Sequence, residues 1–291
     1  MDLKRFNIFD FNRKPTDIPL VDDPNAPAWK KFLKQFASKI SQLLGINFLY
    51  LLFSIPSLVI AYFASFWIFG QSFDKYFGFS IEQNFIEMLV PRVVLGLVMI
   101  LFPVVAVGPV HAGFTYVFRN FSRQKHAYVW WDFKDHALAN MKQGIIVSLI
   151  NLVIVFLLGL AINSYTRVAP EFTGTLSYAA VGFVSIAFAI FLSMNMYIYP
   201  LMVTYDMKIR ELYKVAYSLA FMRLIPNLLL ILGIVVVLFL AYGFLPIIGA
   251  ILTLIILPAT ILFVINYFVD PVIRKLEETQ EEIETSDTDN I

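Results

Sequence analysis

The sequence predicts an all-α membrane protein whose helices cross a bilayer about six times. Of its 291 residues, 59% are hydrophobic and only 15% are charged, whereas a soluble domain usually carries about 25% charged residues. The charged residues gather between long stretches that lack them, and an uncharged stretch of about 20 residues can span the hydrocarbon core as a helix. The apolar runs are continuous rather than alternating, which argues against a transmembrane β-barrel.

The predicted membrane spans are the longest uncharged apolar segments. They cover residues 43–69, 88–118, 144–162, 176–203, 227–242 and 247–269. No water is available in lipid, so each segment must satisfy its own backbone groups, which selects helices. The last two spans form one charge-free stretch that is broken around Gly243–Pro246. We interpret this break as a tight hairpin, although a re-entrant loop would leave the same charges on the same side.

The distribution of Lys and Arg predicts the orientation. Nineteen of the 22 basic residues fall in the N-terminal segment, the loops after the second and fourth spans, and the C-terminal segment, all on one side of the predicted membrane. The other side receives Lys75, Arg92 and Arg167. Positive charge collects in cytoplasmic loops, so both termini are predicted to lie in the cytoplasm. The first long apolar run begins only near Leu43, so no cleavable signal peptide is expected.

The chain divides into three predicted parts. Residues 1–28 form a cytoplasmic N-terminal segment, residues 29–275 form a single transmembrane domain, and residues 276–291 form a cytoplasmic tail. From Glu277 onward the tail carries acidic groups and no basic ones. Such a segment cannot bury enough apolar area to fold, so we expect a disordered tail.

Three short cytoplasmic segments carry apolar residues at helical spacing on one face and polar residues on the other. They begin near Trp29, Trp130 and Ile209, and a helix of this kind can lie on a membrane surface. Each segment precedes a pair of spans. The order is compatible with a weak threefold repeat of surface helix, span and span, and interfacial helices without internal duplication would give the same pattern equally well.

Polar groups inside the predicted spans are amides rather than charged groups. Asn47, Asn151, Asn195 and Asn266 are the conspicuous ones. Amides at this depth usually form hydrogen bonds between helices, and binding of a polyol substrate is the alternative. Arg92, near the outer edge of the second span, is most simply an interfacial arginine.

The sequence indicates no enzyme. It contains no cysteine, which excludes disulfides and thiolate metal sites, and the three histidines lack metal-ligand spacing. Motifs for a P-loop, a nucleophile elbow or a zinc protease are missing. We therefore predict no metal and no cofactor. An intramembrane enzyme that uses His111 or Arg92 is a third, disfavoured hypothesis.

Aromatic and basic residues are concentrated after the second span. The candidate residues for partner docking or membrane-surface contact are Tyr116, Arg119, Asn120, Arg123, Trp130, Trp131, Asp132, Phe133, Asn140 and Lys142. This mixture anchors helices among anionic headgroups, and Trp, Tyr and Arg also dominate protein interfaces. Binding of nucleic acid would use similar residues but is not expected at a membrane edge.

Two stretches carry a family resemblance. They are residues 32–56 (FLKQFASKISQLLGINFLYLLFSIP) and residues 108–144, in which Gly113, Tyr116-Val117, Arg119-Asn120-Phe121, Asp132-Phe133-Lys134 and Asn140-x-Lys142-Gln143 are the most specific part. The chain resembles the YesL-like family of bacterial membrane proteins, whose function is unknown. The resemblance implies a bacterial cell membrane and an association with carbohydrate uptake systems, often beside ATP-driven sugar importers. It brings no catalytic or binding residues.

The leading hypothesis is a non-enzymatic accessory protein or membrane subunit of a carbohydrate uptake system. Its partners would be the lipid bilayer and sugar importer subunits, and it would dock them through its cytoplasmic surface helices. The alternative is a transporter or permease-like subunit that itself carries the substrate path between kinked helices. The sequence gives no signal for an oligomeric state.

Overall fold

The computed structural model describes residues 27–69, 107–167, 175–244 and 246–288, and throughout these ranges every regular element is helical. The predicted all-α fold is therefore confirmed. Five of the described helices are long and apolar enough to cross a membrane, namely those that contain residues 29–55, 141–162, 178–202, 224–244 and 257–279. The chain is a multi-pass membrane protein. Residues 88–106 of the predicted second span lie outside the described residues.

The first helix, α1 (Ala28–Phe69), joins the predicted surface helix and the first predicted span into one continuous element. The apolar face near its start is only partly covered by protein, because Trp29 and Leu33 are 59% and 52% exposed. Phe32 stacks on Phe263 with 5.7 Å between the ring centroids and meets Tyr267 edge-on at 5.1 Å. Because the later helix α12 covers these rings, the first amphipathic stretch continues directly into the bundle.

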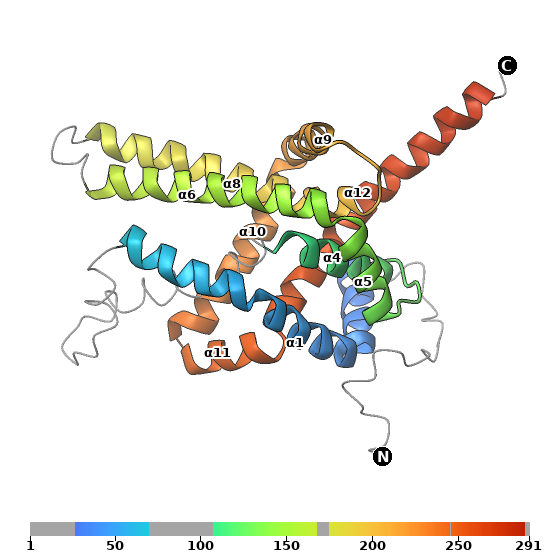
Figure 1. Ribbon diagram of the computed structural model, residues 1–291, viewed down its shortest axis with the longest axis horizontal. Coiled ribbons are helices and arrows are strands. Elements are labelled where there is room, and N and C mark those ends of the chain that lie inside the picture. Colours follow the sequence, from blue (N-terminus) through green and yellow to red (C-terminus); the bar gives the residue numbers. More distant parts are fainter. Residues whose placement is uncertain (1–26, 70–106, 168–174, 245, 289–291) are drawn as a thin grey trace, which may run out of the picture.

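The next described helix along the chain lies near the centre of the molecule (Figure 1). Helix α4 (Gly108–Ser122) ends where Gln124 takes a positive φ of 55°, a conformation that stops helical progression. Helix α5 (Val129–Ala139) then packs across α4, and α6 (Met141–Arg167) follows after Asn140.

Helices α6 and α8 (Thr175–Met202) form a long antiparallel hairpin that projects to one side of the molecule (Figure 1). Helix α9 (Ile209–Met222) follows and covers α8. The apolar faces of α5 and α9 thus cover protein in part, since Phe133 of α5 and Leu212 of α9 are buried, while Leu138 and Tyr217 are 53% and 51% exposed. The order of surface helix, span and span is kept after α5 and after α9, while duplication stays a prediction.

The predicted sixth span, residues 247–269, is wrong in its extent. Helix α10 (Leu224–Phe239) continues into the π-helical turn η2 (Leu240–Phe244), and two helices follow, α11 (Pro246–Ile255) and α12 (Leu257–Thr288). Helix α11 has 10 residues, too few to span a bilayer. Pro258 lacks the N–H that a continuous helix would need, so the helix is interrupted there.

Asn47 of α1 forms hydrogen bonds with the backbone on both sides of this interruption. Its amide nitrogen donates to the carbonyl oxygens of Thr253 and Leu254 at 3.1 and 3.0 Å, and its Oδ1 accepts from the backbone N–H of Ala259 at 3.0 Å. A broken helix inside a membrane protein must have its free backbone groups satisfied by other protein groups, and one buried asparagine provides this for both α11 and α12.

The predicted disordered tail, residues 276–291, is also corrected, because α12 continues to Thr288. Leu276 packs against the main hydrophobic cluster, and Glu277 forms an ion pair with Arg123. These two contacts hold the start of the tail in place, and Glu, Gln and Lys are good helix formers that extend it. Residues 289–291 lie outside the described residues.

The core of the bundle is built around α4, which contacts α1, α5, α6, α8 and α12. One buried cluster combines Ala112 of α4 with side chains of α8, α9 and α12, and another combines Phe114, Phe118 and Phe121 with α1, α5 and α12. Helix α4 therefore lies between the two clusters and connects them.

Candidate functional site

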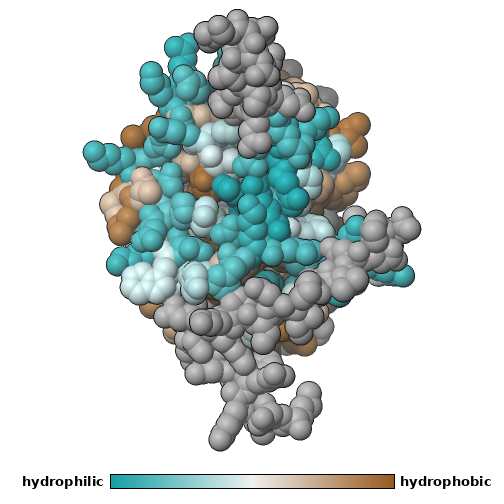
Figure 2. Space-filling view, turned by 90° about the vertical axis from the view of Figure 1, so that its right-hand side faces the viewer, coloured by the Kyte–Doolittle hydropathy of each residue, from teal (hydrophilic) through white to brown (hydrophobic). Residues whose placement is uncertain are grey.

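The end of the molecule that carries the C-terminal half of α4, α5 and residues 270–278 of α12 is hereafter the polar end. Viewed from this side, the surface is mostly hydrophilic, with hydrophobic residues gathered toward its edges (Figure 2). Most of the candidate docking residues fall here. The arrangement is typical of a membrane protein where its helices emerge from the bilayer.

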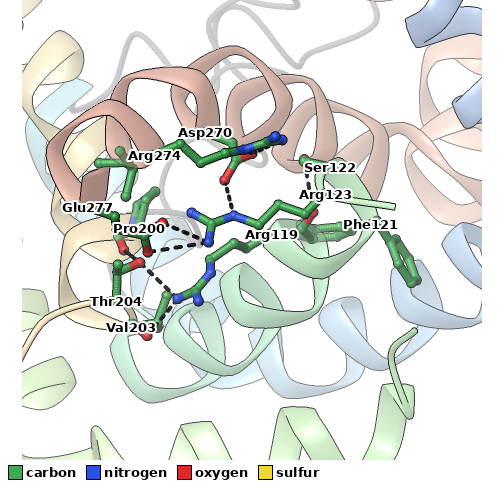
Figure 3. Close-up of polar contacts among 12 residues, drawn as sticks. Arg119, Phe121, Ser122, Arg123, Pro200, Val203, Thr204, Asp270, Arg274 and Glu277 are labelled. Carbon is green, nitrogen blue, oxygen red and sulfur yellow. Dashed lines mark hydrogen bonds and ion pairs between the residues drawn. The ribbon is translucent and has the colours of Figure 1, made fainter. Parts of the chain in front are cut away.

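Arg119 and Arg123 lie one turn apart on α4, and both side chains point into the protein (Figure 3). The Nη1 atom of Arg119 donates to the carbonyl oxygen of Val203 at 3.1 Å and to Oγ1 of Thr204 at 2.9 Å. Burial lowers the pKa of Arg119, and the nearby positive charge of Arg123 lowers it further. Arg119 therefore holds the end of α8 against α4.

Arg123 forms the charged contact between α4 and α12. Its Nε donates to Oδ1 of Asp270 at 2.7 Å, its Nη1 lies 2.9 Å from Oε2 of Glu277, and the side chains of Arg123 and Asp270 are only 8% and 3% exposed. Burial by itself would lower the pKa of Arg123, but the hydrogen bonds and charges of the two carboxylates outweigh it and raise the pKa. The other oxygen of Asp270 accepts from Arg274 at 2.7 Å.

This buried ion-pair network is structural. Removal of one partner from a buried pair typically costs 3–5 kcal/mol, because the remaining charge is left uncompensated. A cavity of about 220 Å³ beside the network is lined by both Arg123 and Lys125 and by both Glu277 and Glu278. Since both signs of charge line the cavity, it has no strong preference for one kind of ion. Arg119 and Arg123, two of the predicted docking residues, are thus occupied inside the protein.

Helix α5 is fixed on α4 by a close crossing. Gly113 has no side chain there, and a Cβ atom would lie 2.5 Å from the carbonyl oxygen of Phe133. The ring of Phe133 stacks on Phe114 with 4.3 Å between centroids, and half-buried Trp130 packs beside Phe133 at 5.9 Å. Of the predicted aromatic residues, Phe133 and Trp130 therefore face inward.

Tyr116 and His136 form a second contact between α4 and α5. Their rings stack with 3.4 Å between centroids, and Arg119 lies 5.4 Å from the centroid of the Tyr116 ring. Partial burial lowers the pKa of His136, so this histidine is not freely solvated. At the start of α5, Asp132 accepts the backbone N–H of Tyr128 at 2.9 Å, and burial raises the pKa of Asp132.

The remaining candidates at the polar end have local roles or are exposed. Asn120 is buried, and its carbonyl oxygen accepts the N–H of Lys125 at 2.8 Å. Asn140 follows the last residue of α5 and donates from Nδ2 to the carbonyl oxygen of His136 at 2.9 Å. Lys142 is exposed in the first turn of α6, and Trp131 is 50% exposed.

Three of the four predicted intramembrane amides join helices. Asn47 has been described, and Asn151 of α6 donates to Oδ1 of Asn195 of α8 at 2.6 Å and also accepts from the Tyr213 hydroxyl of α9 at 3.1 Å. Asn266 donates to Leu262 within its own helix at 2.8 Å. These contacts favour the packing interpretation over a polyol site for Asn47, Asn151 and Asn195.

Sequence reasoning missed two polar contacts and the environment of His111. Asn227 of α10 accepts from the Tyr197 hydroxyl at 2.8 Å, and Gln35 of α1 donates from Nε2 to the carbonyl oxygen of Phe121. His111 is buried in the core and contacts the Tyr199 ring at 4.2 Å. Gln35 lies among lysines in the sequence, and the long-range partners of these side chains could not be found from spacing.

Within the described ranges, no group of three or more His, Cys, Asp or Glu residues is placed to hold a metal ion. No protein-family model, curated protein or solved structure matches the chain. The resemblance to the YesL-like family therefore stays a prediction, and the geometry alone guides the assignment of the site.

Proposed function

We propose that this protein is a non-enzymatic membrane subunit or accessory protein of a carbohydrate uptake system. It docks a partner protein through the outward side of α5, which we define as the α5 face and which consists of Tyr128, Trp131, Lys134, Asp135 and Leu138. The carbohydrate part of the proposal rests on the family resemblance. The position of the docking surface rests on the exposure of these residues.

The α5 face carries the proposal because it is exposed and rigidly supported. Trp131 and Leu138 are 50% and 53% exposed, and the Nζ atom of Lys134 lies 5.6 Å from the centroid of the Trp131 ring. Beneath them Phe133 is locked against Phe114, so the face is already ordered before any partner arrives. A preformed aromatic surface pays little entropy on binding, and Trp and Tyr are the residues that most often dominate interfaces.

The charge distribution supports a cytoplasmic position for this surface. The polar end contains the loop after the second predicted span, which carries five Lys and Arg residues, and the start of the C-terminal segment, which carries Arg274 and Lys275. If these loops follow the positive-inside rule, the α5 face meets the cytoplasm. An importer's ATPase works on that side, so its membrane complex is the partner that the resemblance implies.

A direct sugar path is the competing function, and the chemistry of the bundle disfavours it. A cavity does lie between α4, α8, α10 and α12, but its walls are mostly Ile, Leu, Val and Met. A sugar presents several hydroxyl groups, and each would need a hydrogen-bond partner on leaving water. The cavity offers too few polar groups for this, so we favour docking over transport.

The test compares two pairs of exposed aromatic residues. The double variant Tyr128→Ala/Trp131→Ala removes the aromatic groups of the α5 face, and Tyr178→Ala/Phe183→Ala removes two from α8, where they are 72% and 75% exposed. Each full-length protein is cross-linked in native membranes and purified, and the partners are identified by mass spectrometry. We expect recovery of importer subunits to fall at least tenfold for the α5 variant, as for loss of a hot spot of about 2 kcal/mol.

The α8 variant serves as the matched control and should recover the partners normally. Sugar uptake in a deletion strain should be restored by the wild-type protein and by the α8 variant but not by the α5 variant. Recovery of lipid cross-links without any importer subunit would assign the α5 face to membrane anchoring and overturn the proposal. Equal recovery by both variants would overturn it as well.

A further inference from the structure

The cavity between α4, α8, α10 and α12 has a volume of about 70 Å³. By this measure a single water needs roughly 10–15 Å³, so the space exceeds one water several-fold. Its lining contains no Asp, Glu, Lys or Arg. The walls contributed by α10 are Ile231, Ile234, Val235 and Leu238, all within a membrane-crossing helix.

A few neutral polar groups converge on this apolar space. His111 and Thr115 of α4 and Asn266 of α12 all line it and are all nearly completely buried. The Nδ1 atom of His111 is buried and has no hydrogen-bond partner among the described residues. Asn266 uses its nitrogen on Leu262, which leaves its oxygen as an acceptor.

The position of His111 is fixed by its neighbours. Its ring lies 4.2 Å from the ring of Tyr199 on α8, and its helix is packed on several sides. An unpaired polar atom in a membrane-embedded core is costly, and an ionisable residue at such a depth usually has a binding or transport function. A group that pairs with His111 in the cavity would remove that cost.

From these features we infer that the cavity binds the hydroxyl end of a neutral lipid, with the hydroxyl between His111 and Asn266 and the adjoining part of the chain against the α10 walls. A hydroxyl both donates and accepts, so it can meet the imidazole nitrogen and the amide oxygen together. A charged headgroup would find no countercharge in the lining. A plain hydrocarbon would leave His111 unpaired.

The inference is tested with a diazirine analogue of hexadecanol as a photoaffinity probe. The full-length protein is reconstituted in phosphatidylcholine vesicles and irradiated, and the labelled peptides are mapped. We expect labelling of peptides from α4 and α10. Unlabelled hexadecanol should compete with the probe, whereas hexadecane and hexadecyl phosphate should not.

Two adjacent valines of α10 give a matched pair of blocking variants. Val235 lines the cavity, while Val236 is 47% exposed and does not. Val235→Trp fills the space and should abolish competable labelling, and Val236→Trp should leave labelling unchanged. His111→Phe keeps the aromatic contact with Tyr199 but removes both nitrogens. It should raise the half-saturating probe concentration about five- to tenfold, as expected for one lost hydrogen bond.

Several results would overturn the inference. Labelling that survives Val235→Trp, or that hexadecane or hexadecyl phosphate competes as well as hexadecanol, would show that no hydroxyl-specific site exists in this cavity. An unchanged half-saturating concentration in His111→Phe would do the same. If that variant unfolds, Asn266→Leu is used with the same expected shift. None of these results depends on whether the α5 face docks a partner.

Discussion

Helices α4 and α6 are separated in the chain only by the short helix α5, yet their surroundings differ. Other helices enclose α4, whereas most of α6 is not buried by protein. Helix α4 has 15 residues, and 11 of them are buried by neighbouring helices. Helix α6 has 27 residues, and among those whose side chains are described the buried ones lie in its first half, between Gly144 and Asn151. The rest of α6 exposes Val153, Phe156 and Leu157 along the hairpin with α8.

The two helices show that an apolar sequence does not reveal what covers it. The α4 sequence uses Gly, Ala, Ser, Thr and Phe, which permit close approach and aromatic packing. The α6 sequence uses large aliphatic residues, which suit lipid. Polar contacts follow the same division, because α4 forms a charged network at its C-terminal end while α6 and α8 share neutral amides. We therefore expect substitutions in α4 to destabilise the protein more than comparable changes in the α6–α8 hairpin.

The largest effect is expected from Arg123→Met. This change leaves Asp270 and Glu277 without their buried partner, so the free energy of unfolding should fall by about 3 kcal/mol. The measurement is thermal or denaturant unfolding of the protein in lipid–detergent micelles. Arg274→Met removes the half-exposed partner of the same carboxylate and should cost only about 0.5 kcal/mol. Equal losses in the two variants would contradict the distinction between buried and exposed pairs.

Glycine substitutions compare the packing of α4 with that of the hairpin. A Cβ atom at Gly108 would lie 1.9 Å from the carbonyl oxygen of Gly144, whereas one at Gly182 of α8 would meet nothing within 4 Å. Gly108→Ala should thus destabilise the protein by about 2 kcal/mol, because α4 and α6 must move apart. Gly182→Ala should stabilise it by about 0.5 kcal/mol, since alanine favours the helix. A loss in both variants would show that α8 is more tightly packed than described.

The amide contact of the hairpin should have a smaller effect than the charged network. Asn151→Leu removes the hydrogen bonds to Asn195 and Tyr213 and should lower the free energy of unfolding by about 1 kcal/mol. Ser185→Ala is the control, because exposed Ser185 bonds only to Val181 in its own helix. A loss of 3 kcal/mol in Asn151→Leu would contradict this ranking, because the amide contact would then stabilise the protein as much as the charged network of α4 does.

The smallest effect is expected from pH, at the contact of α4 with α5. The lowered pKa of His136 means that its stabilising contribution is complete above its ordinary value of about 6.5 and is lost as the pH falls through the folded-state pKa. Hydrogen exchange of α5 amides, corrected for the intrinsic effect of pH, should therefore speed up on acidification. In His136→Phe this acceleration should disappear, and amides of the hairpin should show none in either protein.

Sequence patterns predicted the helical class well because each lipid-crossing segment must satisfy its own backbone. The apolar runs that correspond to α6 and α8 were located to within a few residues. Pro258 marks the boundary between α11 and α12 in the sequence, but the contact that satisfies the broken backbone there was missed because it comes from Asn47, about two hundred residues earlier in the chain. The helical start of the predicted tail was missed for a similar reason, since Arg123 is the partner of Glu277.

The site was predictable in its location but not in the roles of its residues. The sequence placed aromatic and basic groups together after the second span, and the structure brings most of them to one end. It could not show that Arg119 and Arg123 point inward while Trp131 points outward, because both kinds of position carry amphipathic side chains. Only the packing of α12 and the end of α8 against α4 distinguishes them.

What the sequence determined by itself is that this chain is helical and enters a membrane several times, because hydropathy and the cost of unsatisfied backbone groups act locally along the chain. What the tertiary structure decided is which apolar helix becomes the centre of the bundle and which charges are buried in pairs. Those outcomes depend on partners far away in the sequence, and the free energy of a buried charge or amide is set by the partner that it meets.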